Sequence, residues 1–198
     1  MKLVLATQNP KKLKEMNEIL RHLGVEVVSE AELGVRIEVE ETGETFTDNA
    51  RLKATAVMQA TGLPTVADDS GLCVDALNGG PGVYSARFGG EGLDDKGRYT
   101  LLLEMLRGQT DRTAHFHTSI VCAFPNGDEL VCEGECPGTI AFAPMGENGF
   151  GYDPVFFVPD KRKTFAQLSA EEKAEISHRG KALRAFKETL KNYLAEHQ

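Results

Sequence analysis

Two adjacent carboxylates lie at the centre of Thr65 to Leu72, TVADDSGL. Apolar residues enter and leave this stretch, so we expect Asp68 and Asp69 at the end of a strand, before a bend at Gly71. Successive strand side chains point to opposite faces, so the two carboxylates should not point the same way. Carboxylate oxygens suit Mg²⁺. Taken alone, the residue types favour an ordinary Asp-rich turn over a metal site, and the sequence does not decide which carboxylate would face a metal.

A candidate anion site follows the first apolar run of the chain. Lys2 to Ala6 predicts a buried strand, and Asn9 and Pro10 suit the N-cap and the first position of a helix. The N–H groups and the dipole at a helix start favour phosphate, and Lys12 adds a positive charge there. The glycines of a Walker loop are missing. Phosphate binding and an ordinary capped helix are therefore about equally supported.

Two later stretches are candidate functional segments, and the first could recognise a planar base. In residues 146–154, GENGFGYDP, glycines flank Phe150 and Asp153. The ring could stack on a base while the carboxylate bonds its edge, or the ring could be tucked into the core. Further on, Ser177 suits a helix N-cap, which puts His178 and Arg179 in the first turn, where cations oppose the dipole preference. A local rule broken without evident compensation hints at function.

Other polar residues are solvated by default. Glu41 lies in an acidic, irregular stretch over 31–45, and Lys53 lies near the middle of a predicted helix. Glu41, next to Glu40, could also complete a metal site, and only tertiary structure could aim Lys53 at a ligand. His115 and His117 share one face of a predicted strand, where a two-histidine metal site is conceivable but solvated histidines are more common.

The elements that must position these residues alternate between strands and helices. The apolar spacing and the capping residues predict strands over 2–6, 25–28, 113–124 and 129–142, the last broken near Pro137 and Gly138, and helices over 10–23, 46–60 and 94–106. Residues 125–128, PNGD, predict a hairpin. A capping box at 169–172 opens a short helix that carries Lys173, and a long helix follows Ser177.

Composition bounds the class of protein. The chain has 198 residues, 41% hydrophobic and 26% charged, which fits one globular domain. A net charge of −8 argues against a general nucleic-acid or membrane-surface binder. The four cysteines match neither a disulfide framework nor a zinc knuckle. The first apolar run is too short for a signal peptide and none approaches membrane-spanning length, so we expect a cytoplasmic protein.

Six motifs, in order and over nearly the whole chain, carry a resemblance to a known family. They are ATQNPKK, EETGETFTDNA, ADDSGL, PGVYSAR, GFGYDPVF and SHRG. Each is weak alone, but together they are specific. The sequence resembles the Ham1/RdgB-like inosine/xanthosine triphosphate pyrophosphatases, which act on non-canonical purine nucleotides. One departure is Gln8, where relatives often carry another residue, and it leaves the matches at Thr7, Asn9 and Lys12 intact.

The resemblance implies an α/β fold of the Maf/Ham1 (ITPase-like) type. It implies one domain over 1–198, with a long mixed twisted sheet flanked by helices and two lobes around a central cleft, usually as a homodimer. The implied reaction is hydrolysis of ITP, dITP, XTP and dXTP to the monophosphate and pyrophosphate, with Mg²⁺ as cofactor. The implied role is cleansing of the nucleotide pool, with no nucleic-acid polymer and no membrane as partner.

The resemblance also implies residue roles. Asp69 is the implied general base and, with Glu41, an implied Mg²⁺ ligand. The implied substrate-binding residues are Thr7, Gln8, Asn9, Pro10, Lys11, Lys12 and Lys53 for the phosphates, and Ser70, Phe150, Gly151, Tyr152, Asp153, Lys173, His178 and Arg179 for the remainder of the substrate and its base. Phosphoryl chemistry depends mostly on positioning and charge stabilisation, which lysines, a helix N-terminus and Mg²⁺ supply.

Donors near the end of the chain predict the base preference. Lys173, His178 and Arg179 are close in sequence and on neighbouring first turns. An oxygen at purine position 6 accepts hydrogen bonds, whereas the amino group of adenine donates them. We therefore expect hypoxanthine and xanthine to be preferred over adenine. The same donors do not explain how guanine, which also carries the oxygen, would be rejected.

Two other functions fit parts of the pattern. A related Maf-like nucleotide pyrophosphatase would differ in base preference, and the SHRG and FGYD stretches argue against it. A nucleotide-binding sensor without turnover would keep the anion and base pockets but would not need Glu41 and Asp69. Incubation with ITP and Mg²⁺, scored for pyrophosphate, separates these functions.

Overall fold

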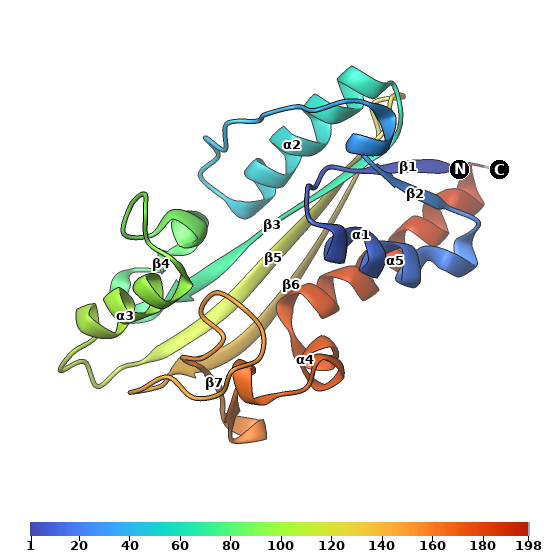
Figure 1. The fold of residues 1–198 in the computed structure, drawn as a ribbon. Helices are drawn as coiled ribbons and strands as arrows, with labels where there is room; N and C mark the ends of the chain where they lie inside the picture. The colour runs from blue at the N-terminus through green and yellow to red at the C-terminus, as the bar shows by residue number, and fades with distance from the viewer. Residues whose placement is uncertain (198) are drawn as a thin grey trace. The chain divides into compact units, whose positions relative to one another are not determined.

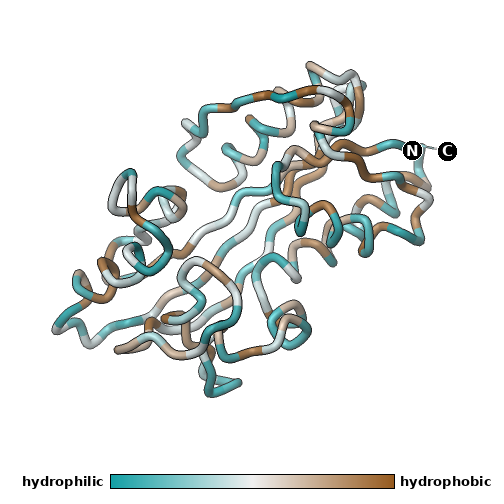
Figure 2. The backbone as a smooth tube through the Cα atoms, viewed as in Figure 1, coloured by the Kyte–Doolittle hydropathy of each residue, from teal (hydrophilic) through white to brown (hydrophobic). Residues whose placement is uncertain are grey.

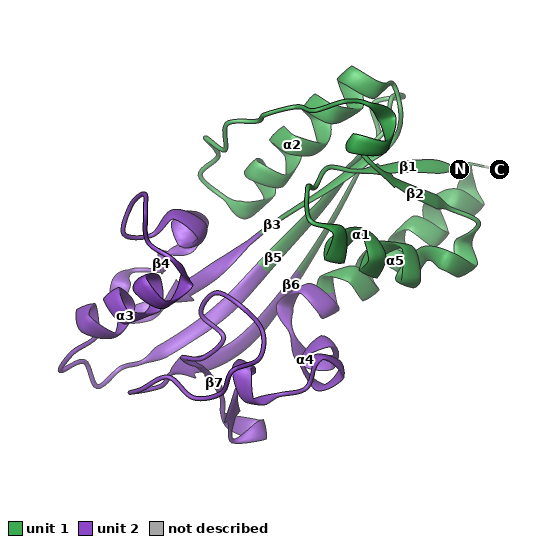
Figure 3. Cartoon of the chain, viewed as in Figure 1, with its two compact units in different colours: residues 1–69, 118–133, 182–198 green, residues 70–117, 134–181 purple. Residues whose placement is uncertain are grey.

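The computed structural model describes residues 1–197, and they divide into two compact units (Figure 3). Unit 1 comprises Met1–Asp69, Thr118–Glu133 and the residues from Ala182 onward, and unit 2 comprises Ser70–His117 and Gly134–Lys181. The chain passes from one unit to the other at 69/70, 117/118, 133/134 and 181/182. Neither unit is therefore one continuous segment of sequence.

Eight strands form one mixed sheet, in the order β2-β1-β3-β5-β6-β7-β8, with β4 paired to β3 off this path (Figure 1). The strands are β1 Lys2–Leu5, β2 Glu26–Ser29, β3 Thr65–Val74, β4 Gly80–Pro81, β5 Thr113–Ala123, β6 Glu129–Ile140, β7 Phe156–Val158 and β8 Lys163–Thr164. β1 pairs in parallel with β2 and β3, whereas β3–β4, β6–β7 and β7–β8 are antiparallel. The predicted α/β class is confirmed.

The first three helices connect strands, and the last two follow β8. They are α1 Pro10–Leu20, α2 Phe46–Thr61, α3 Asp95–Met105, α4 Ala170–Ile176 and α5 His178–Glu196, with short 3₁₀ segments over 21–23, 31–33, 75–77, 82–87, 159–161 and 165–167. Of these, α1, α4 and α5 begin at the predicted caps. Asn9 Oδ1 accepts a hydrogen bond from the Lys11 amide at 2.9 Å, and Ser169 forms the expected capping box. No helix among residues 1–197 combines the length and the apolar character needed to span a membrane.

In unit 1, helices cover both faces of the strands. Met16 of α1 and Phe186 of α5 pack in one apolar cluster with Val66, whereas Ala54 of α2 packs in another with Ala67. Because neighbouring strand residues point to opposite faces, Val66 and Ala67 assign α2 to one face and α1 and α5 to the other, as Figure 1 shows. The apolar strands β1 and β2 are drawn mostly in brown in Figure 2.

Unit 2 has an aromatic core of its own. The rings of Phe116 and Phe156 lie 4.6 Å apart between centroids, and those of Phe156 and Phe165 lie 4.8 Å apart. Leu102 and Leu106, from α3 and the turn after it, join this cluster. The core holds the loop 146–154 and α4 in one compact unit.

Two predictions about strands were wrong, and two short strands were missed. β3 runs unbroken from Thr65 to Val74, so the two carboxylates lie within a strand and not at its end. β6 continues past Pro137 because Thr139 and Ile140 pair with β7. A Cβ at Gly138 would come within 2.6 Å of the Phe156 ring and the Phe157 carbonyl oxygen, so glycine allows β7 to approach. β7 and β8 were not predicted, because three and two residues are too short to show alternation.

Candidate active site

The adjacent carboxylates of β3 contact two different helices of unit 1. Lys12 Nζ of α1 lies 2.8 Å from Asp68 Oδ2, whereas Asn49 Nδ2 of α2 donates to Asp69 Oδ2 at 3.1 Å. α1 and α2 cover opposite faces, which confirms that the two side chains diverge. The side chain of Asp68 is 3% exposed and that of Asp69 is 12% exposed. Asp69 is therefore the carboxylate with more access to solvent.

Lys53 joins the acidic loop to β3. Its Nζ lies 2.7 Å from Glu41 Oε1, donates to the Asp68 carbonyl oxygen at 2.8 Å, and lies 4.0 Å from Asp69 Oδ1. Lys53 and Glu41 are not simply solvated, because the fold of the loop and of α2 against β3 brings both side chains to the same place. The Lys53 ammonium group thus lies beside Glu41 and Asp69, the two carboxylates that the family resemblance implies as Mg²⁺ ligands.

The residues around Lys53 fit a magnesium ion. Glu41 and Asp69 offer only oxygen donors, and because both lie near the same Lys53 Nζ, the two carboxylates are close to each other. Mg²⁺ is usually bound through one or two carboxylates, with water and substrate phosphates completing its ligands. Among residues 1–197, no group of three or more His, Cys, Asp and Glu side chains could hold a metal ion. A two-carboxylate site is consistent with that binding mode.

The N-terminus of α1 presents a capped turn. Thr7 Oγ1 accepts a hydrogen bond from the Asn9 amide at 3.2 Å, and Asn9 in turn caps the helix. Lys11 is exposed, and the side chain of Lys12 is 30% exposed although it pairs with Asp68. The start of α1 and two lysines, Lys12 and Lys53, therefore supply positive groups within unit 1.

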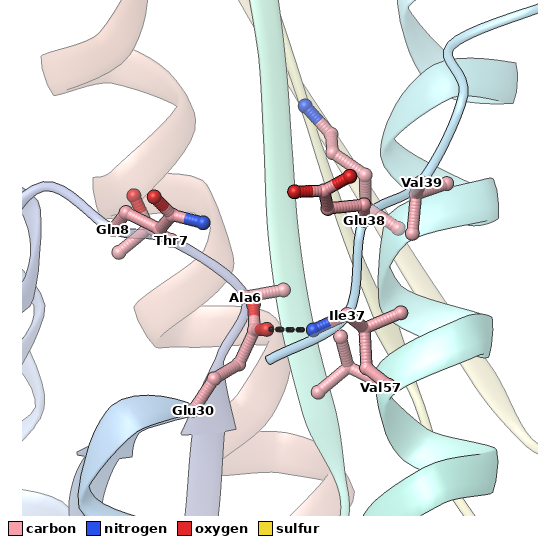
Figure 4. A pocket seen from close by; sticks show the side chains of 9 residues that line it. Ala6, Thr7, Gln8, Glu30, Ile37, Glu38, Val39 and Val57 are labelled. Carbon is pink, nitrogen blue, oxygen red and sulfur yellow. Dashed lines mark hydrogen bonds between the residues drawn. The ribbon is translucent and has the colours of Figure 1, made fainter. Parts of the chain in front are cut away.

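A pocket of about 290 Å³ opens beside these residues (Figure 4). It is lined by Ala6, Thr7, Gln8, Glu30, Ile37, Glu38, Val39, Lys53 and Val57. One wall is fixed by the Ile37 amide, which donates to Glu30 Oε2 at 3.3 Å. Because Glu30 and Glu38 also line the pocket, it does not by itself form an anion site, although it reaches Thr7, Gln8 and Lys53 of the predicted set.

In unit 2, a buried carboxylate organises the loop 146–154. Asp153 Oδ2 accepts hydrogen bonds from Lys173 Nζ at 2.5 Å and from the Phe150 amide at 3.0 Å. Burial raises the pKa of Asp153, and the Lys173 ammonium opposes part of that rise. Gly149 has φ +78°, and a Cβ there would lie 2.0 Å from Asp153 Oδ2, so only glycine fits. The loop is therefore built around this ion pair.

Phe150 lies on the surface of this loop. Its exposed fraction is 75%, so the alternative in which the ring is tucked into the core was wrong. Lys173 Nζ lies 4.8 Å from the centre of the ring. An exposed aromatic face next to a cation can stack on a planar base. Tyr152, in contrast, is buried, and its hydroxyl donates to the Ser85 carbonyl oxygen at 2.7 Å. Any ligand contact from Tyr152 would come from its backbone.

The start of α5 brings a histidine to the same aromatic cluster. The His178 ring is stacked on Phe116, with centroids 4.6 Å apart and an angle of 12°. The Phe165 ring lies 6.4 Å from the His178 ring and 5.3 Å from Lys173 Nζ. Ser177 Oγ accepts from the Gly180 amide at 3.0 Å, as an N-cap should. Unit 2 thus brings together Lys173, His178 and Asp153, with Arg179 next along the helix.

The remaining predicted residues lie at the edges of these groups. Ser70 follows Asp69 within β3 and is the first residue of unit 2. The Gly151 amide donates to Asp95 Oδ2 at 2.8 Å. His117 Nδ1 lies 3.0 Å from Glu135 Oε1, which gives this strand histidine a carboxylate neighbour.

Sequence reasoning missed Asn49. The side chain is fully buried and touches Asp69 directly. Asn49 lies inside EETGETFTDNA, in the first turn of α2. Its place in that motif was a signal that could have identified it.

The fold and these groups define an α/β protein with a carboxylate–lysine site suited to a divalent cation and phosphates, and with an aromatic–cation group suited to a planar base. Comparison with known proteins then gives the family. The chain belongs to the Ham1 family, whose model matches residues 3–189.

Individual relatives match along nearly their whole length. A dITP/XTP pyrophosphatase of Desulforamulus reducens is 53% identical over 200 residues, covering 100% of this chain and 99% of the relative. A dITP/XTP pyrophosphatase of Exiguobacterium sp. is 52% identical, covering 93% and 94%. The solved structure of the Staphylococcus aureus Ham1 protein has a TM-score of 0.93 at 42% identity, covering 98% of this chain and 100% of that chain.

Proposed function

We propose that this protein hydrolyses ITP, dITP, XTP and dXTP to the nucleoside monophosphate and pyrophosphate, and so removes these nucleotides from the cellular pool. The observation that carries the proposal is the arrangement of Glu41, Lys53 and Asp69 around one point of unit 1. The full-length relatives named dITP/XTP pyrophosphatase support the same activity.

Unit 1 supplies the groups for the phosphates and the attacking water. Asp69 has the greater access to solvent of the two β3 carboxylates, and its proposed role is to orient the water and accept its proton. Lys12, Lys53 and the start of α1 would neutralise phosphate oxygens. Glu41 and Asp69 would hold Mg²⁺, which when bound supplies charge neutralisation for the leaving pyrophosphate.

Unit 2 supplies the groups for the base. Phe150 offers a stacking face, and Lys173, His178 and Arg179 offer hydrogen-bond donors for a purine oxygen at position 6. A site that hydrogen-bonds one polar group can reject an analogue lacking it by ~10⁴ or more, whereas shape alone gives roughly 10². The donors therefore favour inosine and xanthosine triphosphates over ATP.

A product assay tests the function. The protein with Mg²⁺ is incubated separately with ITP, XTP, GTP and ATP, and the corresponding nucleoside monophosphate and the pyrophosphate are quantified. We expect equal amounts of the two products, with ITP and XTP far ahead of ATP. Release of orthophosphate would indicate a stepwise phosphatase, and binding of ITP without product would indicate a sensor.

Three properties complete the proposal. We propose that the chain is a single ITPase-like domain, that it forms a homodimer, and that it works in the cytoplasm on small nucleotides without a nucleic-acid polymer or a membrane. The net charge of −8 supports the last point. Light scattering coupled to gel filtration measures the oligomeric state.

A further inference from the structure

Asn49 connects the two elements that carry the proposed metal ligands. Its Oδ1 accepts a hydrogen bond from the Gly43 amide at 2.8 Å, and its Nδ2 donates to Asp69 Oδ2 at 3.1 Å. Gly43 lies two residues after Glu41, in the acidic loop. One amide group therefore bonds both to that loop and to the carboxylate on β3.

The two contacts fix the orientation of the Asn49 amide. A backbone N–H can only donate, so the oxygen of the side chain must face Gly43. The NH₂ group must then face Asp69, where a carboxylate accepts it. Asn49 is fully buried, so water does not compete for these bonds. No other orientation satisfies both partners.

The loop approaches Asn49 closely. A Cβ at Gly43 would lie 2.7 Å from Asn49 Oδ1 and 2.7 Å from Asp48 Cβ. Both distances are shorter than a carbon atom tolerates, so only glycine lets the loop reach this bond without a shift. The hydrogen bond between Gly43 and Asn49 thus connects the loop to α2 at close approach.

We propose that Asn49 is a positioning residue for the pyrophosphatase reaction, and that it holds Asp69 and the Glu41 loop at the separation a divalent cation needs. The inference rests on the proposed function and adds a residue to it. With Asp69 Oδ2 engaged by Asn49, Oδ1 is the oxygen on the side of Lys53, 4.0 Å from its Nζ. Asn49 thereby sets which oxygen faces the Glu41 side.

The contacts predict a separate effect on kcat and KM. Removal of a group that orients a metal ligand typically lowers metal affinity or activity about 10–100-fold. Asn49 bonds to Asp69 and Gly43, and neither bond involves the lysines proposed for phosphate. Asn49→Ala should therefore lower kcat for ITP by about 10–100-fold with KM for ITP unchanged.

Two further variants separate the two bonds. Asn49→Asp keeps an oxygen for the Gly43 amide but replaces the donor with a second carboxylate oxygen against Asp69. Its kcat for ITP should fall by at least as large a factor as that of Asn49→Ala. Gly43→Ala keeps the Asn49 amide but forces the loop away from it, and it should lower kcat in the same direction. Asn17→Ala is the matched control, because Asn17 Nδ2 also ties a helix of unit 1 to a strand, through the Val27 carbonyl oxygen at 3.2 Å.

Metal binding is measured without turnover. The full chain is titrated with Mn²⁺ by calorimetry, and Asn49→Ala should raise the Kd by about 10-fold or more while Asn17→Ala leaves it unchanged. Thermal unfolding of each variant shows whether it is folded. A folded Asn49→Ala variant with wild-type kcat and wild-type Mn²⁺ affinity overturns the proposal, as does a lower Tm with unchanged Mn²⁺ affinity.

The same experiment distinguishes this proposal from the function on which it rests. If the wild-type protein releases no pyrophosphate from ITP, the proposed function fails. The Mn²⁺ titration still decides the role of Asn49 in that case, because it needs no substrate.

Discussion

Asp68 and Asp69 are neighbours of the same type, yet their surroundings differ. Asp68 is almost fully buried and pairs with Lys12, whereas Asp69 is more exposed and lies near Glu41 and Lys53. A carboxylate that is almost closed to solvent is less accessible to a metal ion or to an attacking water molecule. The surroundings therefore favour Asp69 as the metal ligand and general base and give Asp68 the task of orienting Lys12.

Replacing Asp69 tests this division. Asp69→Asn keeps the shape of the side chain but removes the proton acceptor, so kcat for ITP should fall by about 10²–10⁴-fold. The loss of a proposed metal ligand would add to this. The measurement is steady-state pyrophosphate release, with circular dichroism to confirm the fold. Asp68→Asn is the comparison, and a larger kcat loss in that variant would transfer the role of base to Asp68.

Lys12 should act on the phosphates beyond the first. Lys12→Ala should weaken binding of a triphosphate more than binding of inosine monophosphate, because the monophosphate lacks two of the three phosphate groups. Both affinities are measured by calorimetry, with a slowly hydrolysed ITP analogue as the triphosphate. Lys14→Ala is the control on the same helix, where Lys14 is exposed and lies 3.9 Å from Glu18. Equal weakening for both ligands would show that Lys12 does not contact the β/γ end.

Arg179 should contribute to the choice of base. Arg179→Ala removes one donor of the group proposed to contact the purine oxygen. We expect kcat/KM for ITP to fall by roughly 10²-fold or more, and the ratio of ITP to ATP activity to shrink. Lys191→Ala, an exposed change later in α5, should leave the ratio unchanged. Proportional loss of ITP and ATP activity would assign Arg179 to phosphate binding or to the fold.

At the scale of elements, the sequence predicted the helices better than the strands. The helix starts were predictable because capping is local: Asn9, Ser169 and Ser177 each accept a hydrogen bond from their own helix. The extent of β3 was not, because residues 68–71 are turn-forming types that are nevertheless extended, in a strand that lies between β1 and β5 in the sheet. The face of Asp69 depended on where α2 packs, and no local pattern contains that information.

The junction between α4 and α5 is closely packed around Gly180. A Cβ at this position would lie 1.9 Å from the Ala174 carbonyl oxygen. Gly180→Ala should therefore displace the start of α5 and cost about 1–3 kcal/mol of stability. Because His178 lies in the same turn, KM for ITP should rise as well. Thermal unfolding and ITP kinetics measure the two effects, and Glu188→Ala, at an exposed position of α5, is the control. An unchanged Tm would mean that the two helices adjust without cost.

At the scale of the whole molecule, the chain path links the folding of the two units. β3, β5 and β6 each contribute residues to both units, and the chain crosses the boundary at 69/70, 117/118, 133/134 and 181/182. Unfolding of either unit would therefore disrupt β3, β5 and β6, which the other unit shares. We therefore expect the chain to unfold in a single cooperative transition, as one domain would.

Core variants in each unit test this expectation. Leu5 of unit 1 and Phe156 of unit 2 are both fully buried. Leu5→Ala should cost about 2–5 kcal/mol and Phe156→Ala about 3–5 kcal/mol. If the units unfold together, each variant lowers the Tm of the same transition, and the calorimetric and van't Hoff enthalpies agree. If they unfold separately, the calorimetric trace contains two transitions and each variant moves only one of them. Separate unfolding would require each shared strand to break at 69/70, 117/118 or 133/134 while half of it remained folded. A single shared transition supports the single-domain proposal, and two transitions would contradict it.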